Sequence, residues 1–378
     1  MKQIVIAGSG FAGAAAVQAL RGEGCSAPIT LVAPQPELFY YPSLIWVSAG
    51  LRSKRDLSVP LASFFRRYGV DYVQGSVTGL DAGAGRVRTT AGEMAYQRVV
   101  ITTGGRYIKK LPGLEHAFIP CEGYGPVAAM SERLGALQEG TLAFGFAGNP
   151  EEPAAMRGGP IFEFLFGVDT LLRRQKRRDR FDLVFFTPAT EPGKRLGPQA
   201  MGSLMREMEA RGIRTHVGHK LKGFTANKVM TEGGDITSDL TVFTPGMAGP
   251  AWAAGSGLPL SVGGFIRADE HCRVLGFEGS VYVAGDVGSF PGPDWMPKQG
   301  HAADLQARAL ARNLVGDLRG ERTEHTFRRE LICVVDTLDS GILVFRDPQH
   351  SAVFKSFALH WSKRLFEQAY IGRCRPSS

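Results

Sequence analysis

The sequence contains few cysteines, and their spacing excludes two common roles for this residue. Only five occur among 378 residues, and no two of them form a Cys-x-x-Cys pair. Neither a zinc site nor a thioredoxin-like redox pair can be read from this spacing, and we predict no metal site. An odd number of cysteines without a signal sequence also argues against a secreted disulfide framework.

Long hydrophobic runs are also missing. No stretch of 18 apolar residues occurs, so we predict that the chain does not span a membrane. The apolar segment 3–7 begins almost at once, which leaves no room for a secretion signal. We therefore expect synthesis and folding in the cytoplasm.

Charge is low in amount but unbalanced. Charged residues make up only 21% of the chain, and no block of basic residues is interleaved with aromatics. This composition does not favour a nucleic-acid partner. The net charge of +8 still indicates an anionic partner, which leaves a membrane surface or an acidic cofactor or substrate.

Apolar residues and glycine are abundant, at 44% of the chain and 48 residues respectively. Segment 3–7 predicts a buried parallel strand, 11–21 an alanine-rich helix and 29–33 a second strand, which together form a βαβ unit. Further strands are expected at 70–74, 86–90, 98–102, 141–147 and 182–186, and further helices at 160–177, 198–211 and 299–315. This alternation predicts an α/β fold with two Rossmann-like domains.

The first turn of the βαβ unit carries a glycine-rich loop, Gly8, Gly10 and Gly13. Gly8 permits a tight turn, Gly10 lets the backbone approach a pyrophosphate, and Gly13 allows close packing of helix on strand. Phe11 and Ala12 begin the helix, whose N–H groups and dipole favour an anion. The loop therefore predicts a dinucleotide site.

The acidic residue that would hold the adenosine ribose is missing from the end of the second strand. Ala33 stands in that place, and Glu37 or Gln35 are the alternatives for the ribose contact.

Two later phrases favour FAD among the dinucleotides. The strand that ends in Thr103 and Gly104 resembles the segment that precedes the crossover out of an FAD domain. The phrase that contains Gly285 and Asp286 resembles a second FAD fingerprint, in which the aspartate accepts a hydrogen bond from a ribityl hydroxyl. FAD is the predicted cofactor.

A third phrase, Pro297-Lys298, precedes a helix whose N-terminus would face the flavin pyrimidine edge. Lys298 could there stabilise an anionic reduced flavin. The predicted organisation is a discontinuous FAD-binding domain (1–111 and 246–320), a second Rossmann-like domain (112–245) and a C-terminal region (321–378).

The glycine turn of the second domain is degraded. Segment 144–153 reads FGFAGNPEEP, with two prolines at the expected helix start. Glu151 and Glu152 would face the pyrophosphate, which is poor chemistry for binding a second dinucleotide. We expect the electrons to come from a donor other than NADH.

Four segments are typical of one group of flavoproteins: YPSLIWVSAG at 41–50, GPIFEF at 159–164, PKQG at 297–300 and CVVDTLDSG at 333–341. Through them the chain resembles, over nearly its whole length, the sulfide:quinone oxidoreductase and flavocytochrome c sulfide dehydrogenase group. The first and last segments are the most diagnostic. Pro42, in the first, is assigned to the cofactor site.

The resemblance implies that sulfide attacks cysteine sulfur beside the flavin, and that this chemistry requires a polarisable thiolate. Cys333, in the last segment, is the predicted redox cysteine. Cys121 matches another family cysteine, and it could pair with Cys333, attach to the flavin or have no role. Met156, Arg157 and Gly158 stand where the family has its second redox cysteine, with Arg157 nearest that position. This departure leaves the sulfur substrate and product open.

Segment 354–372 places apolar and aromatic residues at helical spacing on one face and basic residues on the other. This pattern predicts either an interfacial helix or a helix packed on the protein core. The resemblance favours peripheral attachment at the cytoplasmic face of the inner membrane, where the segment would collect quinone. The candidates for quinone contact are Phe345, Phe354, Trp361 and Phe366, with Tyr41 and Phe39 near the flavin.

The predicted function is FAD-dependent oxidation of sulfide, or of a related reduced sulfur species, with electron transfer to a membrane quinone. Three alternatives remain: a type II NADH:quinone oxidoreductase, the flavin subunit of a flavocytochrome c sulfide dehydrogenase, and a non-catalytic FAD-binding protein.

Overall fold

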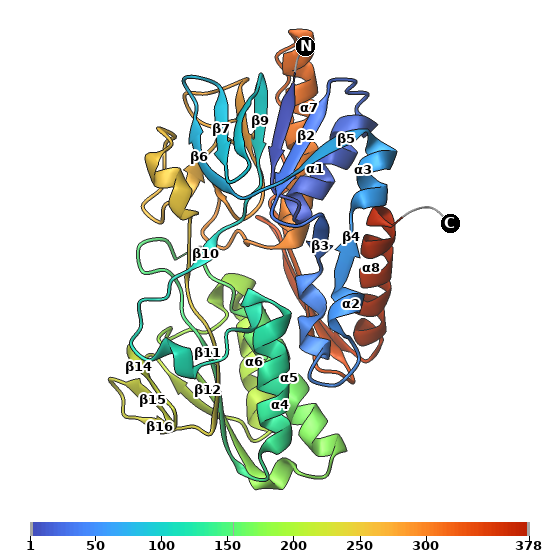
Figure 1. Cartoon of the computed structure of the whole chain (residues 1–378). Coiled ribbons are helices and arrows are strands. Elements are labelled where there is room, and N and C mark those ends of the chain that lie inside the picture. Colours follow the sequence, from blue (N-terminus) through green and yellow to red (C-terminus); the bar gives the residue numbers. More distant parts are fainter. Residues whose placement is uncertain (1–2, 154, 376–378) are drawn as a thin grey trace.

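The computed structural model describes residues 3–153 and 155–375, so residues 1–2, 154 and 376–378 of the predicted segments lie outside the described residues. Two parallel sheets lie at opposite ends of the molecule, and the C-terminal segment runs along one side of both (Figure 1). The predicted α/β fold with two Rossmann-like units is confirmed.

The first sheet has the strand order β20-β9-β1-β2-β5, with every neighbouring pair parallel. Its strands are β1 (Ile4–Ala7), β2 (Ile29–Ala33), β5 (Val70–Gln74), β9 (Arg98–Ile101) and β20 (Val281–Val283). Its last strand, β20, comes from a distant part of the chain, and the strands of the second sheet lie in the intervening sequence.

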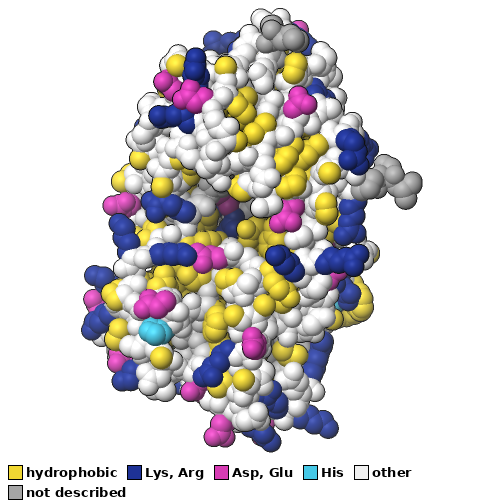
Figure 2. Space-filling view, in the orientation of Figure 1, with side chains coloured by type: hydrophobic (Ala, Val, Ile, Leu, Met, Phe, Trp, Pro, Cys, Tyr) yellow, Lys and Arg dark blue, Asp and Glu magenta, His cyan; other side chains and the backbone are white. Residues whose placement is uncertain are grey.

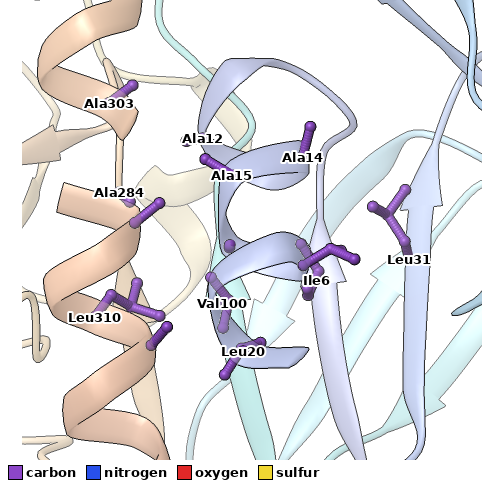
Figure 3. Close-up of a cluster of buried hydrophobic side chains, with 14 of the residues drawn as sticks. Ile6, Ala12, Ala14, Ala15, Leu20, Leu31, Val100, Ala284, Ala303 and Leu310 are labelled. Atoms are coloured by element: carbon purple, nitrogen blue, oxygen red, sulfur yellow. The ribbon is translucent and has the colours of Figure 1, made fainter. Parts of the chain in front are cut away.

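Side chains alternate along β1 to serve two faces. Ile4 and Ile6 pack with the helices α1 (Phe11–Gly22) and α7 (Gly300–Arg319), whereas Val5 and Ala7 belong to the core of the opposite face. The small side chains of the two helices let them approach closely, as Ala12, Ala15 and Ala303 show in Figure 3. The opposite face is covered by an antiparallel sheet of β6 (Val77–Asp81), β7 (Arg86–Thr89) and β8 (Gly92–Ala95).

The second sheet repeats this plan with the order β13-β12-β11-β17, again all parallel. Its strands are β11 (Gly140–Phe146), β12 (Phe181–Thr187), β13 (Arg214–Val217) and β17 (Leu240–Thr244). One face is covered by the helices α4 (Tyr124–Ala136), α5 (Gly159–Arg174) and α6 (Pro198–Ala210). The other face is covered by β14 (Leu221–Thr225), β15 (Lys228–Thr231) and β16 (Ile236–Thr237).

The chain crosses between the two units twice, and the crossings are joined. The short strand β10 (Arg106–Tyr107) pairs antiparallel with β18 (Met247–Ala248). This pairing fixes the carboxyl ends of the two sheets relative to each other, where ligands bind in open α/β sheets. The remaining short elements are α2 (Lys54–Leu57), α3 (Ala62–Tyr68), β3 (Glu37–Phe39), β4 (Ser58–Pro60), β19 (Ile266–Arg267) and β21 (Gly288–Ser289).

The C-terminal region forms an antiparallel sheet of β22 (Leu331–Asp336), β23 (Gly341–Arg346) and β24 (Ser351–Ser356), followed by α8 (Ala358–Cys374). The expectation that Phe354 lies on the helix is wrong, because β24 continues the hairpin and pairs Phe354 with Leu343 of β23. The helix starts only at Ala358 and runs beside β4 and α2 (Figure 1).

In the first part of helix α8 several polar side chains are buried and several apolar ones are exposed, whereas Tyr370 and Ile371 near its end are buried in the core. His360, Lys363 and Glu367 are buried or nearly so, with side chains 7%, 13% and 2% exposed, whereas Trp361 is 59% and Leu365 65% exposed. The inward groups are satisfied by ion pairs, among them Glu367 with Arg52. An outward apolar face of this kind is unusual on a helix in water and indicates an apolar partner.

Candidate functional site

A cavity of about 1480 Å³ opens between the two units and reaches the C-terminal region. The surface is hollowed at this level, and hydrophobic side chains gather in the hollow (Figure 2). The volume exceeds the range of about 300–1,000 Å³ that is usual for small-molecule pockets, so the cavity has room for an extended dinucleotide.

Most of the predicted cofactor residues come together on the wall of this cavity. The ones that line it are Gly8, Gly10, Phe11, Ala12, Pro42, Thr103, Gly104, Gly285, Asp286, Pro297 and Lys298. Apart from Pro42, which lies in the 3-10 helix Tyr41–Trp46, they follow the ends of β1, β9 and β20 or precede α7, because parallel strands present their carboxyl ends at one edge of a sheet.

The glycine loop has the geometry that its pattern predicts. Gly8 has φ +116°, and a Cβ on it would lie 2.6 Å from the carbonyl oxygen of Thr102. Gly13 does not line the cavity; it holds α1 against the loop, and a Cβ on it would lie 2.0 Å from the Gly8 carbonyl oxygen. Gly10 has no neighbour within 4 Å of a Cβ, so its side-chain position is open space beside the N-terminus of α1. This is room for a pyrophosphate.

Two substitutions separate these roles. Gly13→Ala should destabilise the protein by about 1–3 kcal/mol or more, because the methyl group overlaps the backbone, and FAD binding should be lost with it. Gly10→Ala is the matched variant, since its backbone φ of −70° and its free surroundings tolerate a methyl group. It should keep the thermal unfolding midpoint of the FAD-free protein but lose FAD affinity. Equal FAD affinity in the wild type and both variants would contradict the assignment of the loop.

The ribose end of the cavity differs from the expectation. Ala33 is buried, and its carbonyl oxygen accepts hydrogen bonds from Tyr72 Oη at 2.8 Å and from the Gly75 N–H at 3.0 Å. Neither Ala33 nor the alternatives Gln35 and Glu37 line the cavity. The wall is formed here by Val32, Pro34, Gly75, Ser76 and Val77.

Three charged side chains, Arg157, Asp286 and Lys298, lie together on the wall of the cavity. Arg157 forms an ion pair with Asp286 through Nη2, and its Nε donates to the Lys298 carbonyl oxygen at 3.2 Å. The Lys298 ammonium donates to the carbonyl oxygens of Asp286 and Gly288, at 3.0 and 2.8 Å. Burial lowers the pKa of Lys298 to about 8, although the Asp286 carboxylate opposes this shift.

The two predicted cysteines line the same cavity but have different neighbours. Cys333 Sγ lies 3.8 Å from the position of a Cβ on Gly159, at the start of α5. Cys121 Sγ lies 3.8 Å from Thr244 Oγ1. All five cysteines are free thiols, so no disulfide joins Cys121 to Cys333.

The thiol of Cys333 is not the ready thiolate that the resemblance implies. Burial raises its pKa to about 12; the Glu163 carboxylate adds to this shift and the Lys363 ammonium opposes it. Burial also raises the pKa of Cys121, against the Arg157 guanidinium. A proton must therefore be taken from Cys333 before its sulfur can act as a nucleophile.

A buried network that sequence reasoning missed lies beside Cys333. The Glu163 carboxylate accepts from Lys363 Nζ and from the Asp336 N–H, the latter at 2.9 Å. His360 Nδ1 lies 2.8 Å from the Asp336 carboxylate. Burial raises the pKa of Glu163, while Lys363 opposes the shift. The sequence held one indication of this network, because Glu163 stands among the apolar residues of α5 and a buried carboxylate needs a partner.

Three of the predicted quinone residues, Phe345, Phe354 and Trp361, do not line the cavity, whereas Phe366 does. Phe345 is half-buried on β23, and Phe354 and Trp361 are 60% and 59% exposed on the surface. The cavity wall is formed in this region by Leu343, Leu359, Phe366 and Tyr370, and Tyr41 lines it near Pro42, whereas Phe39 does not. Within residues 3–153 and 155–375, no helix has the length and apolar character needed to cross a membrane.

The sequence predicted that Glu152 would face the place of a pyrophosphate in the second unit, but its carboxylate has other partners. Its carboxylate accepts from Ser261 Oγ at 2.5 Å and from the Gly263 N–H at 3.1 Å. In the preceding turn the Glu151 N–H donates a hydrogen bond to Oδ1 of Asn149. The degraded glycine turn thus contacts the loop before β19 through the Glu152 carboxylate.

Comparisons with known proteins agree with this geometry. Residues 2–127 match the family model described as pyridine nucleotide-disulphide oxidoreductase. The chain is 23% identical to a sulfide-quinone reductase of Aquifex aeolicus, over 99% of this chain and 91% of the relative. It is 25% identical to an NADH dehydrogenase-like protein of Mycobacterium tuberculosis, over 76% and 73% of the two chains.

The crystal structure of the sulfide:quinone oxidoreductase from Aquifex aeolicus superimposes with a TM-score of 0.91 at 22% identity, covering 99% of this chain and 92% of that one. The resemblance expected from the sequence is confirmed. The chain is a flavoprotein oxidoreductase, and FAD is its cofactor.

Proposed function

We propose that this flavoprotein oxidises sulfide, or a related reduced sulfur species, and delivers the electrons to a quinone at a membrane surface. The observation that carries the proposal is the position of Cys333, a thiol on the wall of the FAD cavity beside a buried acid and a buried cation. The Aquifex relative, whose name states sulfide and quinone as its substrates, supports it.

In this proposal Cys333 holds the sulfur of the substrate as a persulfide. A bond forms between the substrate sulfur and Cys333 Sγ, two protons leave, and two electrons are removed, so the sulfur pair is oxidised. FAD, when bound, supplies this two-electron oxidation and passes the electrons to the quinone. Glu163 accepts a proton from this side of the cavity, because its raised pKa brings it closer to neutral pH than an ordinary carboxylate.

Helix α8 supports the membrane part of the proposal. Its outward side carries Phe357, Trp361 and Leu365, which are 74%, 59% and 65% exposed. Arg364 stacks over the Trp361 ring at 5.1 Å, and Arg373 is exposed farther along the helix. Aromatic side chains beside basic ones suit the interface of an anionic bilayer. On the inward side, Phe366 and Tyr370 line the cavity, so an apolar quinone that leaves the bilayer meets apolar side chains on its way in.

The NADH dehydrogenase-like relative keeps one alternative open, electron donation by NADH. Anaerobic mixing decides between the donors. Sulfide should bleach the flavin absorbance, while NADH at the same concentration should leave the flavin oxidised. The reason is that Glu152, bonded to Ser261 and Gly263, occupies the glycine turn of the second unit. The same mixing with an established NADH-reducible flavoprotein is the control. Bleaching by NADH and not by sulfide would refute the proposal.

A further inference from the structure

The cation that has donors left for the cofactor is not the lysine that the sequence suggested. We infer that Arg157 is the residue that stabilises the reduced flavin, and that it thereby raises the midpoint potential of the bound cofactor. The inference rests on the FAD site alone, so it does not depend on whether sulfide is the electron donor.

Lys298 has no donor left for a ligand. An ammonium carries three N–H groups. Two of them are used by the carbonyl oxygens of Asp286 and Gly288, and the nitrogen lies 3.7 Å from the centre of the Phe265 ring, which takes the third direction. Lys298 therefore holds the turn after β20 together. Its lowered pKa, about 8, also means that much of its charge is lost at alkaline pH.

Arg157 still has donors to offer. A guanidinium carries five N–H groups, and the described residues use three of them, through Asp286, the Lys298 carbonyl oxygen and Tyr107 Oη at 3.5 Å. The Arg157 side chain is 24% exposed and lines the cavity, so its remaining donors lie where a ligand can reach them. Burial alone lowers the pKa of Arg157, but Asp286 and the neighbouring Tyr107 and Cys121 raise it overall, so the charge persists at any working pH.

The location connects this charge to the flavin ring. Asp286 and the segment before α7 are the two phrases expected to contact the ribityl chain and the pyrimidine edge, and Arg157 bonds to both. It reaches them from the second unit, in the segment between β11 and α5. A donor held in a buried site stabilises charge that develops on the cofactor more than it stabilises the uncharged form. The reduced cofactor should consequently bind more tightly than the oxidised one.

The test is the midpoint potential of FAD in the purified holoprotein, measured by spectroelectrochemistry. Arg157→Gln removes the charge and should weaken the binding of reduced relative to oxidised FAD by about tenfold to a hundredfold, as loss of a charge-assisted hydrogen bond does. That ratio corresponds to a fall of about 30–60 mV for a two-electron couple. Arg157→Lys keeps the charge and should restore at least half of the fall.

Lys298→Met is the matched comparison and should change the potential less than Arg157→Gln does. An unchanged potential in Arg157→Gln, or a larger fall in Lys298→Met, overturns the inference. If Arg157→Gln does not retain FAD, only Arg157→Lys and Lys298→Met are compared. The inference then requires that the midpoint potential of Arg157→Lys stays within about 15 mV of the wild-type value, which is half of the fall expected for a tenfold change in relative binding. A larger fall overturns it. A purely structural role for Arg157 would change FAD retention and leave the potential unaltered.

Discussion

Cys333→Ser should lower the rate of flavin reduction by sulfide by about a thousandfold or more, while FAD stays bound. A serine hydroxyl cannot form the persulfide that the proposed reaction needs, and removal of a covalent nucleophile typically costs this much. The substitution is sterically mild, because the side chain is half-buried on β22 at the edge of the cavity. Anaerobic stopped-flow absorbance of the flavin gives the rate, and the ratio of FAD to protein confirms that the cofactor is retained.

Cys25→Ala is the matched control, since Cys25 lies in the core between α1 and β2 and does not line the cavity. The flavin of Cys25→Ala should be reduced by sulfide at the wild-type rate. Cys121→Ser decides the open role of the second cysteine. A thousandfold loss in Cys121→Ser with full activity in Cys333→Ser would assign the redox sulfur to Cys121 and refute the role given to Cys333.

Replacing Phe357, Trp361 and Leu365 together with serine should release the protein from lipid vesicles. Taking about 1.5 kcal/mol for each apolar side chain that enters the bilayer interface, the three contribute roughly 4.5 kcal/mol, or about a thousandfold in vesicle affinity. Co-sedimentation with vesicles that contain anionic lipid measures this affinity. Flavin reduction by sulfide in solution should stay unchanged, because none of the three side chains lines the cavity.

Val262→Ser is the matched control for this experiment. Val262 is 78% exposed and lies in the loop before β19. Its substitution therefore removes an exposed apolar side chain without changing α8. It should bind vesicles as the wild type does. If the triple variant still sediments with vesicles like the wild type, α8 is not the membrane contact, and its apolar side must face another partner.

The features predicted correctly from the sequence are those that local chemistry determines. The loop from Gly8 to Gly13 was readable because only glycine tolerates the backbone and close contacts at Gly8 and the close contacts at Gly13. The strands and helices of both units were readable because buried parallel strands and amphipathic helices have distinct periodicities. Phe354 was misplaced because helical spacing on the surface was given more weight than the hairpin that β24 completes with β23.

The features that were missed depend on residues far apart in the chain. Arg157 and Asp286 meet across 129 positions, and Glu163 and Lys363 across 200. No pattern within a segment indicates such a pair; only the need to neutralise a buried charge does. The same need explains why α8 turns Lys363 and Glu367 inward: Glu163 and Arg52 each require a partner there.

The discontinuity of the first sheet also determines when the cofactor can be acquired during synthesis. The glycine loop leaves the ribosome before the second unit, but β20, Asp286 and the start of α7 follow only after the whole of that unit. That unit is continuous in sequence and can therefore form first, as domains generally fold as units during translation. The edge of β9 stays unpaired until β20 arrives, which exposes the nascent chain to aggregation while the whole second unit is being made. FAD can therefore be acquired only after β20 and the start of α7 have been made, so flavin limitation should deplete chains that extend past α7 and not shorter intermediates.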